Sequence, residues 1–245
     1  MRRLSFLALT VMALALLVQS AAADGFFFST GNPDGKMATA SRPESTGGKF
    51  EIESADDFAI TSFTNITSAT FTGLLTAGAT PSNVGVEIYR VFPADSNVAR
   101  TTGPPNFSVP PNGPPFTVPT RVNSPSDVAF ATRDSSVGGG LSFTTQILSQ
   151  SFTAANSVIP NGIILAPPGT TGGNGPLTGQ EVQFTVTFTT PFSLPADHYF
   201  FVPQVQVNGG GRFFLALSAQ AYRAPWNLIS GRLYRLAELD PGRFS

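Results

Sequence analysis

The acidic side chains that could do chemistry gather in one short stretch, Glu51–Phe58. Carboxylates at close quarters offer the hard oxygen ligands that calcium prefers, and Glu53, Asp56 and Asp57 are the candidate ligands for such an ion. The stretch lacks the regular spacing of a dedicated calcium loop, so the alternative is a solvated turn that leads into a strand. The sequence therefore predicts either one structural calcium ion or no cofactor.

Two carboxylates that flank a glycosidic bond can also act as acid and base. Asp57 and the distant Glu181 are the pair that would do so in this chain. A cleft that cleaves sugars would gain from tryptophan and tyrosine platforms, yet the chain has one tryptophan and four tyrosines. A glycan-acting hydrolase is therefore an alternative to the expected function.

Nucleophilic catalysis would have to use His198, the single histidine, as its base. The sequence contains no Gly-x-Ser-x-Gly elbow to present a serine, so we expect His198 to be a half-exposed strand residue. The chain has no cysteine, which excludes thiolate catalysis, disulfides and cysteine metal sites. We expect no enzymatic activity.

Charged residues make up 12% of the chain, where about 25% is usual, so neutral polar residues must cover much of the surface. Without residues 1–23, which hold Arg2 and Arg3, 12 of the 14 basic residues remain against all 15 acidic ones. This balance provides no basic excess to neutralise phosphates, which excludes a nucleic-acid partner.

The elements that must position these residues are strands. Polar and apolar residues alternate without a fault over Glu181–Thr189, which predicts a half-buried strand. Asn208–Gly211 is a turn signal, and it predicts that His198–Val207 and Arg212–Ser218 pair as a hairpin. Proline cannot donate to a ladder, so Pro203 should lie at an edge or a bulge. Further strand-sized runs lie between proline- and glycine-rich turns: Asp57–Ile60, Ile66–Leu75, Val84–Phe92, Val128–Thr132 and Leu141–Thr153.

This spacing of short strands predicts an all-β fold, an antiparallel β-sandwich of jelly-roll-like form. Residues 1–23 read as a signal peptide, with Arg2 and Arg3 before an apolar run that is short for a membrane span. Residues 24–220 would form the β-sandwich domain, and 221–245 a tail that is a short helix or disordered. We expect no membrane span after signal removal, and a location outside the cell, at its surface or in the periplasm.

Three segments carry a resemblance to a family: Ala55–Phe58, Ile66–Gly73 and Phe192–Phe200. Together they resemble exported bacterial β-sandwich proteins of uncharacterised function. Many of those are similar to the group whose C-terminus carries a Pro-Glu-Pro sorting signal and an anchor. This chain departs from that group after Ser218, where it holds neither a Pro-Glu-Pro sequence nor a long apolar run. The resemblance implies an exported β-sandwich and supplies no catalytic residues.

These observations favour a noncatalytic secreted protein that binds extracellular polysaccharide or a matrix protein. The low charge and the 22 phenylalanines also fit a purely structural matrix component, which is the second alternative.

Overall fold

The computed structural model describes residues 27–44, 51–91, 95, 101–102, 107–108, 118–119, 125–160 and 173–218. In these residues the fold is all-β, as expected, and no helix long and apolar enough to cross a membrane occurs among them. The strands are β1 (Pro33–Ala40), β2 (Asp56–Ile60), β3 (Thr64–Leu75), β4 (Thr80–Val91), β5 (Thr101–Thr102), β6 (Phe107–Ser108), β7 (Val118–Pro119), β8 (Pro125–Asp134), β9 (Leu141–Ala154), β10 (Asn156–Val158), β11 (Leu177–Leu194), β12 (Asp197–Asn208) and β13 (Phe213–Ser218).

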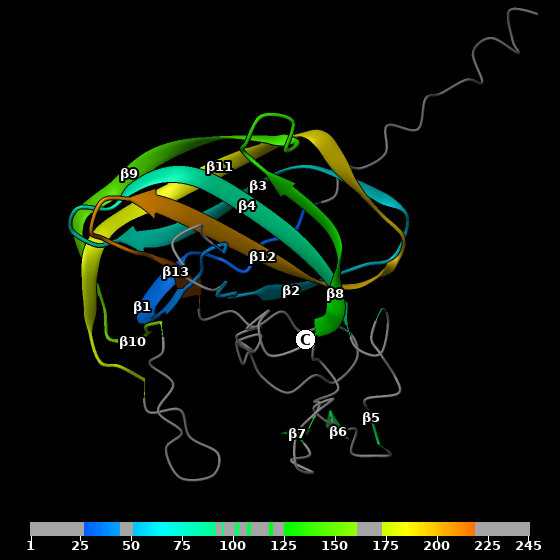
Figure 1. Cartoon of the computed structure of the whole chain (residues 1–245), viewed down its shortest axis with the longest axis horizontal. Coiled ribbons are helices and arrows are strands. Elements are labelled where there is room, and N and C mark those ends of the chain that lie inside the picture. Colours follow the sequence, from blue (N-terminus) through cyan, green and yellow to red (C-terminus); the bar gives the residue numbers. More distant parts are fainter. Residues whose placement is uncertain are drawn as a thin grey trace, which may run out of the picture.

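Two main sheets form the sandwich-like body (Figure 1). One has six strands in the order β10-β1-β13-β3-β11-β9, and the other has four in the order β2-β12-β4-β8. The two-residue strands β5, β6 and β7 form a separate small sheet. All pairings in the main sheets are antiparallel except that of β1 with β10.

The strand pairs are nested along the chain. β1 pairs with β13, β2 with β12, β3 with β11 and β4 with β8. The members of successive pairs alternate between the two sheets, while β9 and β10 are added to the ends of the six-stranded sheet. The sequence-based prediction of a β-sandwich-like fold is thus supported, and its jelly-roll detail stays a prediction at this point.

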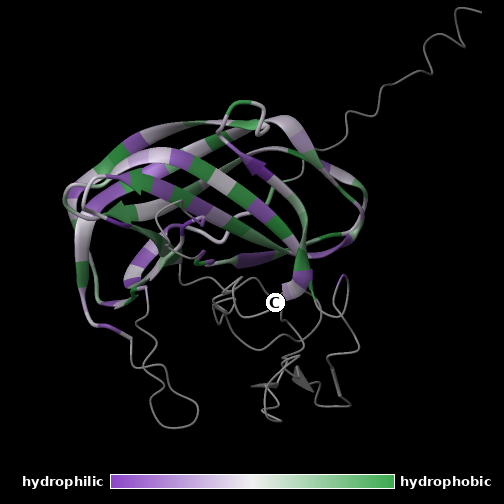
Figure 2. Cartoon of the chain, viewed as in Figure 1, coloured by the Kyte–Doolittle hydropathy of each residue, from purple (hydrophilic) through white to green (hydrophobic). Residues whose placement is uncertain are grey.

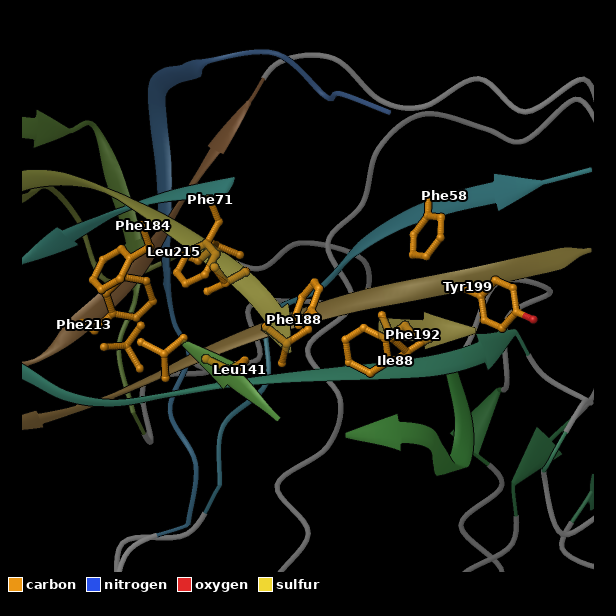
Figure 3. Close-up of a cluster of buried hydrophobic side chains, with 14 of the residues drawn as sticks. Phe58, Phe71, Ile88, Leu141, Phe184, Phe188, Phe192, Tyr199, Phe213 and Leu215 are labelled. Atoms are coloured by element: carbon orange, nitrogen blue, oxygen red, sulfur yellow. The ribbon is translucent and has the colours of Figure 1, made fainter. Parts of the chain in front are cut away.

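The core lies between the two sheets and is built by period-two alternation (Figure 3). The apolar face predicted for Glu181–Thr189 is confirmed, because Val182, Phe184, Val186 and Phe188 are all buried. Phe184 stacks on Phe71 with ring centroids 5.0 Å apart and meets Phe213 edge-on at 5.4 Å. Truncation of such a phenylalanine to alanine costs about 3–5 kcal/mol of stability.

The predicted hairpin between the last two long strands is wrong. β12 pairs with β2 and β4, whereas β13 pairs with β1 and β3 in the other sheet. The Gly-rich segment therefore connects the two sheets. It lies beside Thr76, where the chain passes from β3 to β4. The Arg212 N–H donates to Thr76 Oγ1 (2.8 Å), and the Thr76 N–H donates to the Arg212 carbonyl (3.0 Å). An Asn-Gly turn signal reports only a local change of direction, and long-range pairing decides which strand comes next.

Pro203 lies in the interior strand β12 and not at a bulge, but it lies beyond the residues of β12 that pair with β2. The pairing with β2 reaches only to Phe201, which lies opposite the first residue of β2. Pro203 therefore has β4 as its strand partner on one side and Ser41 on the other. Ser41 Oγ donates to the Pro203 carbonyl (2.6 Å), and the Val205 N–H donates to the Ser41 carbonyl (3.3 Å). The ladder therefore loses no β2 hydrogen bond at the proline. The predicted signal peptide (residues 1–23) and tail (221–245) lie outside the described residues.

Candidate functional site

The outer face of the four-stranded sheet, which points away from the main core, gathers most of the site. Along β4, Val84, Val86 and Ile88 enter the core, so the alternate residues Glu87 and Tyr89 lie on the outer face. The segment that precedes β2 lies over this face and places Ala55 in a small buried cluster with Tyr89, Phe200 and Val202. Polar side chains on this face are therefore removed from water.

Two glutamates of this segment meet one glutamate of β4. We call the three the glutamate cluster: Glu51, Glu53 and Glu87. One carboxylate oxygen from each lies within 4.8 Å of the others. The Tyr89 hydroxyl lies 2.8 Å from Glu53 Oε1 and 2.9 Å from Glu87 Oε2, and the Gln204 amide donates to Glu51 Oε1. Two elements far apart in the sequence, residues 51–55 and β4, thus build one polar network.

Burial dominates the electrostatics of the glutamate cluster. Glu53 is 4% exposed, and loss of hydration raises its pKa to about 9, helped by Glu87 and Glu51 and opposed by the hydrogen bond from Tyr89. Burial raises the pKa of Glu51 as well, against the donation from Gln204. The pKa of Tyr89 is raised by burial and by both neighbouring carboxylates, so the tyrosine stays neutral. One hydroxyl proton serves only one carboxylate, and a protonated Glu53 supplies the second donor that the network needs.

The structure separates the three predicted calcium ligands. Glu53 belongs to the glutamate cluster, whereas Asp56 and Asp57 are consecutive residues of β2, whose side chains point to opposite faces of a strand. Asp57 Oδ2 lies 2.7 Å from His198 Nε2. Asp56 accepts from the Asp57 N–H (3.0 Å) and shares a side-chain hydrogen bond with Thr30, and burial raises its pKa. Glu53, Asp56 and Asp57 do not converge on one point.

The sequence analysis missed Glu87 and Tyr89. A usable signal was present, because both occupy the polar phase of the alternating run Val84–Val91, whose other phase is entirely apolar through Ile88. The sequence around Glu87 and Tyr89 does not indicate that residues 51–55 cover them, because the contact between the two regions joins residues more than 30 positions apart.

Among the described residues, the side chains proposed for the hydrolase alternatives do not form one catalytic site. His198 is a partly buried residue of β12, stacked on Phe200 with centroids 6.1 Å apart, and its side chain pairs with Asp57. Among the described residues, no hydroxyl group is hydrogen-bonded to its ring, as a nucleophile would be. Glu181 lies in β11 of the six-stranded sheet, and Asp57 lies in β2 of the other.

A second surface lies on the outer face of the six-stranded sheet, which we call the neutral face. It consists of three cross-strand rows on β3, β11 and β9, and the strand registers place its members side by side. The rows are Thr72–Gln183–Gln146, Thr70–Thr185–Thr144 and Ser68–Thr187–Ser142. All nine side chains are uncharged hydroxyls or amides, and seven of them are exposed. Figure 2 shows the alternation of hydropathy along these strands.

The two surfaces offer different chemistry. The glutamate cluster can share protons or present carboxylate oxygens to a cation, whereas the neutral face presents hydrogen-bond donors and acceptors to the solvent. Comparison of the chain with protein-family models, with curated proteins and with solved structures finds no match.

Proposed function

We propose that this chain is a noncatalytic exported β-sandwich protein whose neutral face binds extracellular polysaccharide. The observation that carries the proposal is the unbroken grid of hydroxyl and amide side chains over β3, β11 and β9. Such groups both donate and accept hydrogen bonds, as sugar hydroxyls do. Their lack of charge suits a neutral glycan and predicts binding that salt weakens little.

The spacing of the neutral face supports an extended ligand. Neighbouring strands lie about 4.8 Å apart, and side chains on one face repeat about every 7 Å along a strand. Three rows on three strands thus present a continuous polar surface to a chain molecule. Each hydrogen bond adds about 0.5–1.5 kcal/mol, so affinity must come from several contacts together.

We also propose the jelly-roll form of the sandwich. Its support is the nested order described above, in which β1-β13-β3-β11 faces β2-β12-β4-β8. Pairs of first with last, second with second-last and so on give the double-sheet interleaving of that fold. In this arrangement both faces that could hold ligand are sheet surfaces and need no long loop.

The test removes hydroxyls from the middle row without changing its shape. We expect Thr70→Val, Thr144→Val and Thr185→Val together to reduce retention in affinity gels cast with neutral polysaccharides roughly tenfold, the effect of losing about 1.4 kcal/mol. Thr132→Val, at an exposed threonine of β8 in the other sheet, is the matched control and should bind as the unaltered protein does. Equal retention of all three proteins, or no retention of the unaltered protein by any polysaccharide, would refute the proposal.

A structural calcium ion is a second candidate, now at the glutamate cluster in place of Glu53, Asp56 and Asp57. It is supported by three carboxylates whose oxygens lie within 4.8 Å of one another. Binding must displace the Glu53 proton, so stabilisation by calcium should grow as pH rises toward 9. We expect calcium to raise the melting temperature of the unaltered protein at pH 9 and to leave that of Glu53→Gln unchanged. An equal response of the two proteins, or none, would contradict this candidate.

A further inference from the structure

Strand β9 forms one border of the six-stranded sheet and is unusually open. It runs for 14 residues, and no described strand pairs with its outer edge. Ile147 and Leu148 are 50% and 46% exposed on it. An edge strand presents a row of backbone N–H and carbonyl groups that can pair with another strand.

The other three edges of the main sheets carry the devices that block such pairing. β10 has only three residues, β2 has five with two aspartates, and β8 contains a proline and three charged residues. Short length, charge and proline are the means by which natural sheets avoid edge-to-edge association. β9 contains no charged residue and no proline. The contrast marks this edge as one that is meant to be covered.

The sequence of β9 is compatible with antiparallel pairing to the same strand of a second copy. Antiparallel self-pairing about a two-fold axis at Thr145 sets Phe143 opposite Ile147 on the inner side of the sheet, and Thr144 opposite Gln146 on the outer side. Apolar side chains thus meet apolar ones, and a hydroxyl meets an amide. The strand carries no charge, so no like charges face each other across the axis.

The pairing stretch is bounded by the structure itself. β9 follows β11 in regular register from Leu141 to Ile147, and the register shifts beyond that point. Ser149 Oγ donates to the Ser151 carbonyl (2.9 Å) and accepts from the Ser151 N–H (3.3 Å), so the backbone groups of Ser151 already have a partner. The middle residue of the regular part is Thr144, and the exposed Thr145 lies next to it.

We propose that β9 is a homodimerisation strand, and that two copies pair through it antiparallel about Thr145 into one continuous sheet. A two-fold axis perpendicular to the sheet keeps both neutral faces on the same side of the dimer. The inference goes beyond polysaccharide binding and does not depend on it.

Sedimentation velocity over a range of protein concentrations tests the interface. We expect the unaltered protein to dimerise, and Thr145→Lys to weaken association at least tenfold, because two lysines would then face each other on the axis. Thr145→Glu should do the same, and an equimolar mixture of the two variants should restore the dimer. Thr187→Lys, an exposed threonine of the interior strand β11, is the matched control and should dimerise normally. Circular dichroism of each variant reports that the fold is kept.

Cross-linking then tests the register. The chain has no cysteine, so Thr145→Cys introduces a single thiol at the proposed axis. Residues directly opposite in an antiparallel pair have Cβ atoms about 4.5–5.5 Å apart, close to disulfide geometry, and oxidation should yield a covalent dimer. Thr187→Cys should remain uncross-linked. A protein that is monomeric at every concentration, a dimer that Thr145→Lys leaves intact, or a dimer that Thr145→Cys fails to cross-link would each overturn the proposal.

Discussion

The outer faces of the two sheets differ in how far their polar side chains are exposed to water. On the six-stranded sheet, Thr70, Thr144 and Thr185 stand exposed in water and need no partner from the protein. On the four-stranded sheet, Glu53 belongs to the covering segment 51–55, is buried against the sheet and depends on Tyr89 and Glu87 for its hydrogen bonds. A neutral hydroxyl in water costs the fold little, whereas a buried carboxyl must be protonated or paired. The comparison implies that stability is more sensitive to substitutions on the covered face, whereas the binding proposed above uses the open one.

The largest expected effect is the pH dependence of stability that Glu53 imposes. Its pKa rises from 4.5 to about 9 on folding, so between these values the folded protein holds a proton that the unfolded chain has lost. The contribution of Glu53 to the free energy of unfolding should therefore be fully present below about pH 4.5 and be lost progressively as pH rises to about 9. The slope contributed by this one group reaches about 1.4 kcal/mol per pH unit.

Urea unfolding at a series of pH values measures this decline. Glu53→Gln keeps the shape of the protonated side chain and cannot ionise, so it should flatten the curve. Asp56, whose pKa is also raised, does not interact with Glu53 and cancels in the difference, whereas Glu51 is coupled to Glu53 and the difference includes that coupling. Parallel curves for the two proteins would show that Glu53 is ionised in the folded state.

Tyr89→Phe should have the next largest effect, a loss of about 2 kcal/mol, because it removes the hydroxyl that lies within hydrogen-bond distance of the buried Glu53 and the partly buried Glu87. Tyr199→Phe is the matched control. The Tyr199 hydroxyl donates to the Pro195 carbonyl (3.0 Å), and its loss should cost about 1 kcal/mol. Chemical denaturation at neutral pH compares the two, and equal losses would mean that the glutamate cluster is no more demanding than an ordinary hydrogen bond.

A smaller effect is expected for the pair of Asp57 and His198, whose side chains are 28% and 19% exposed. A double-mutant cycle with Asp57→Asn and His198→Gln should give a coupling energy of about 0.5 kcal/mol, as expected for a partly solvated polar pair. Thermal unfolding of the four proteins measures it. A coupling energy well above that value would place this pair with the buried network instead of with the solvent-exposed groups.

The smallest effect should come from the neutral face. Thr185→Ala removes one hydroxyl that lies between Thr70 and Thr144 and should change the free energy of unfolding by no more than about 0.5 kcal/mol. Denaturant unfolding provides the measurement. A loss as large as that of Tyr89→Phe would mean that the rows stabilise the sheet and would remove the contrast between the two faces.

The sequence by itself predicted most of the long strands, although not β1 or β10, and it predicted the buried phase of one of them. The alternation over Glu181–Thr189 fixed which residues of β11 enter the core, because side chains of a strand point to opposite faces in turn whatever its neighbours are. The same kind of alternation in β4 places Glu87 and Tyr89 on the outer face, a conclusion that the sequence analysis did not draw. The low proportion of charged residues likewise predicted a surface of neutral polar residues.

Only the tertiary structure decided which strands and which acids come together. The turn at Asn208–Gly211 predicted a hairpin, yet β13 lies in the other sheet between β1 and β3. Glu53 found its partners in Glu51 and Glu87 and not in Asp56 and Asp57, although the aspartates are nearer in sequence than Glu87. Strand pairing and the course of a covering segment depend on contacts between residues far apart along the chain. The local pattern of polar and apolar residues does not predict these contacts.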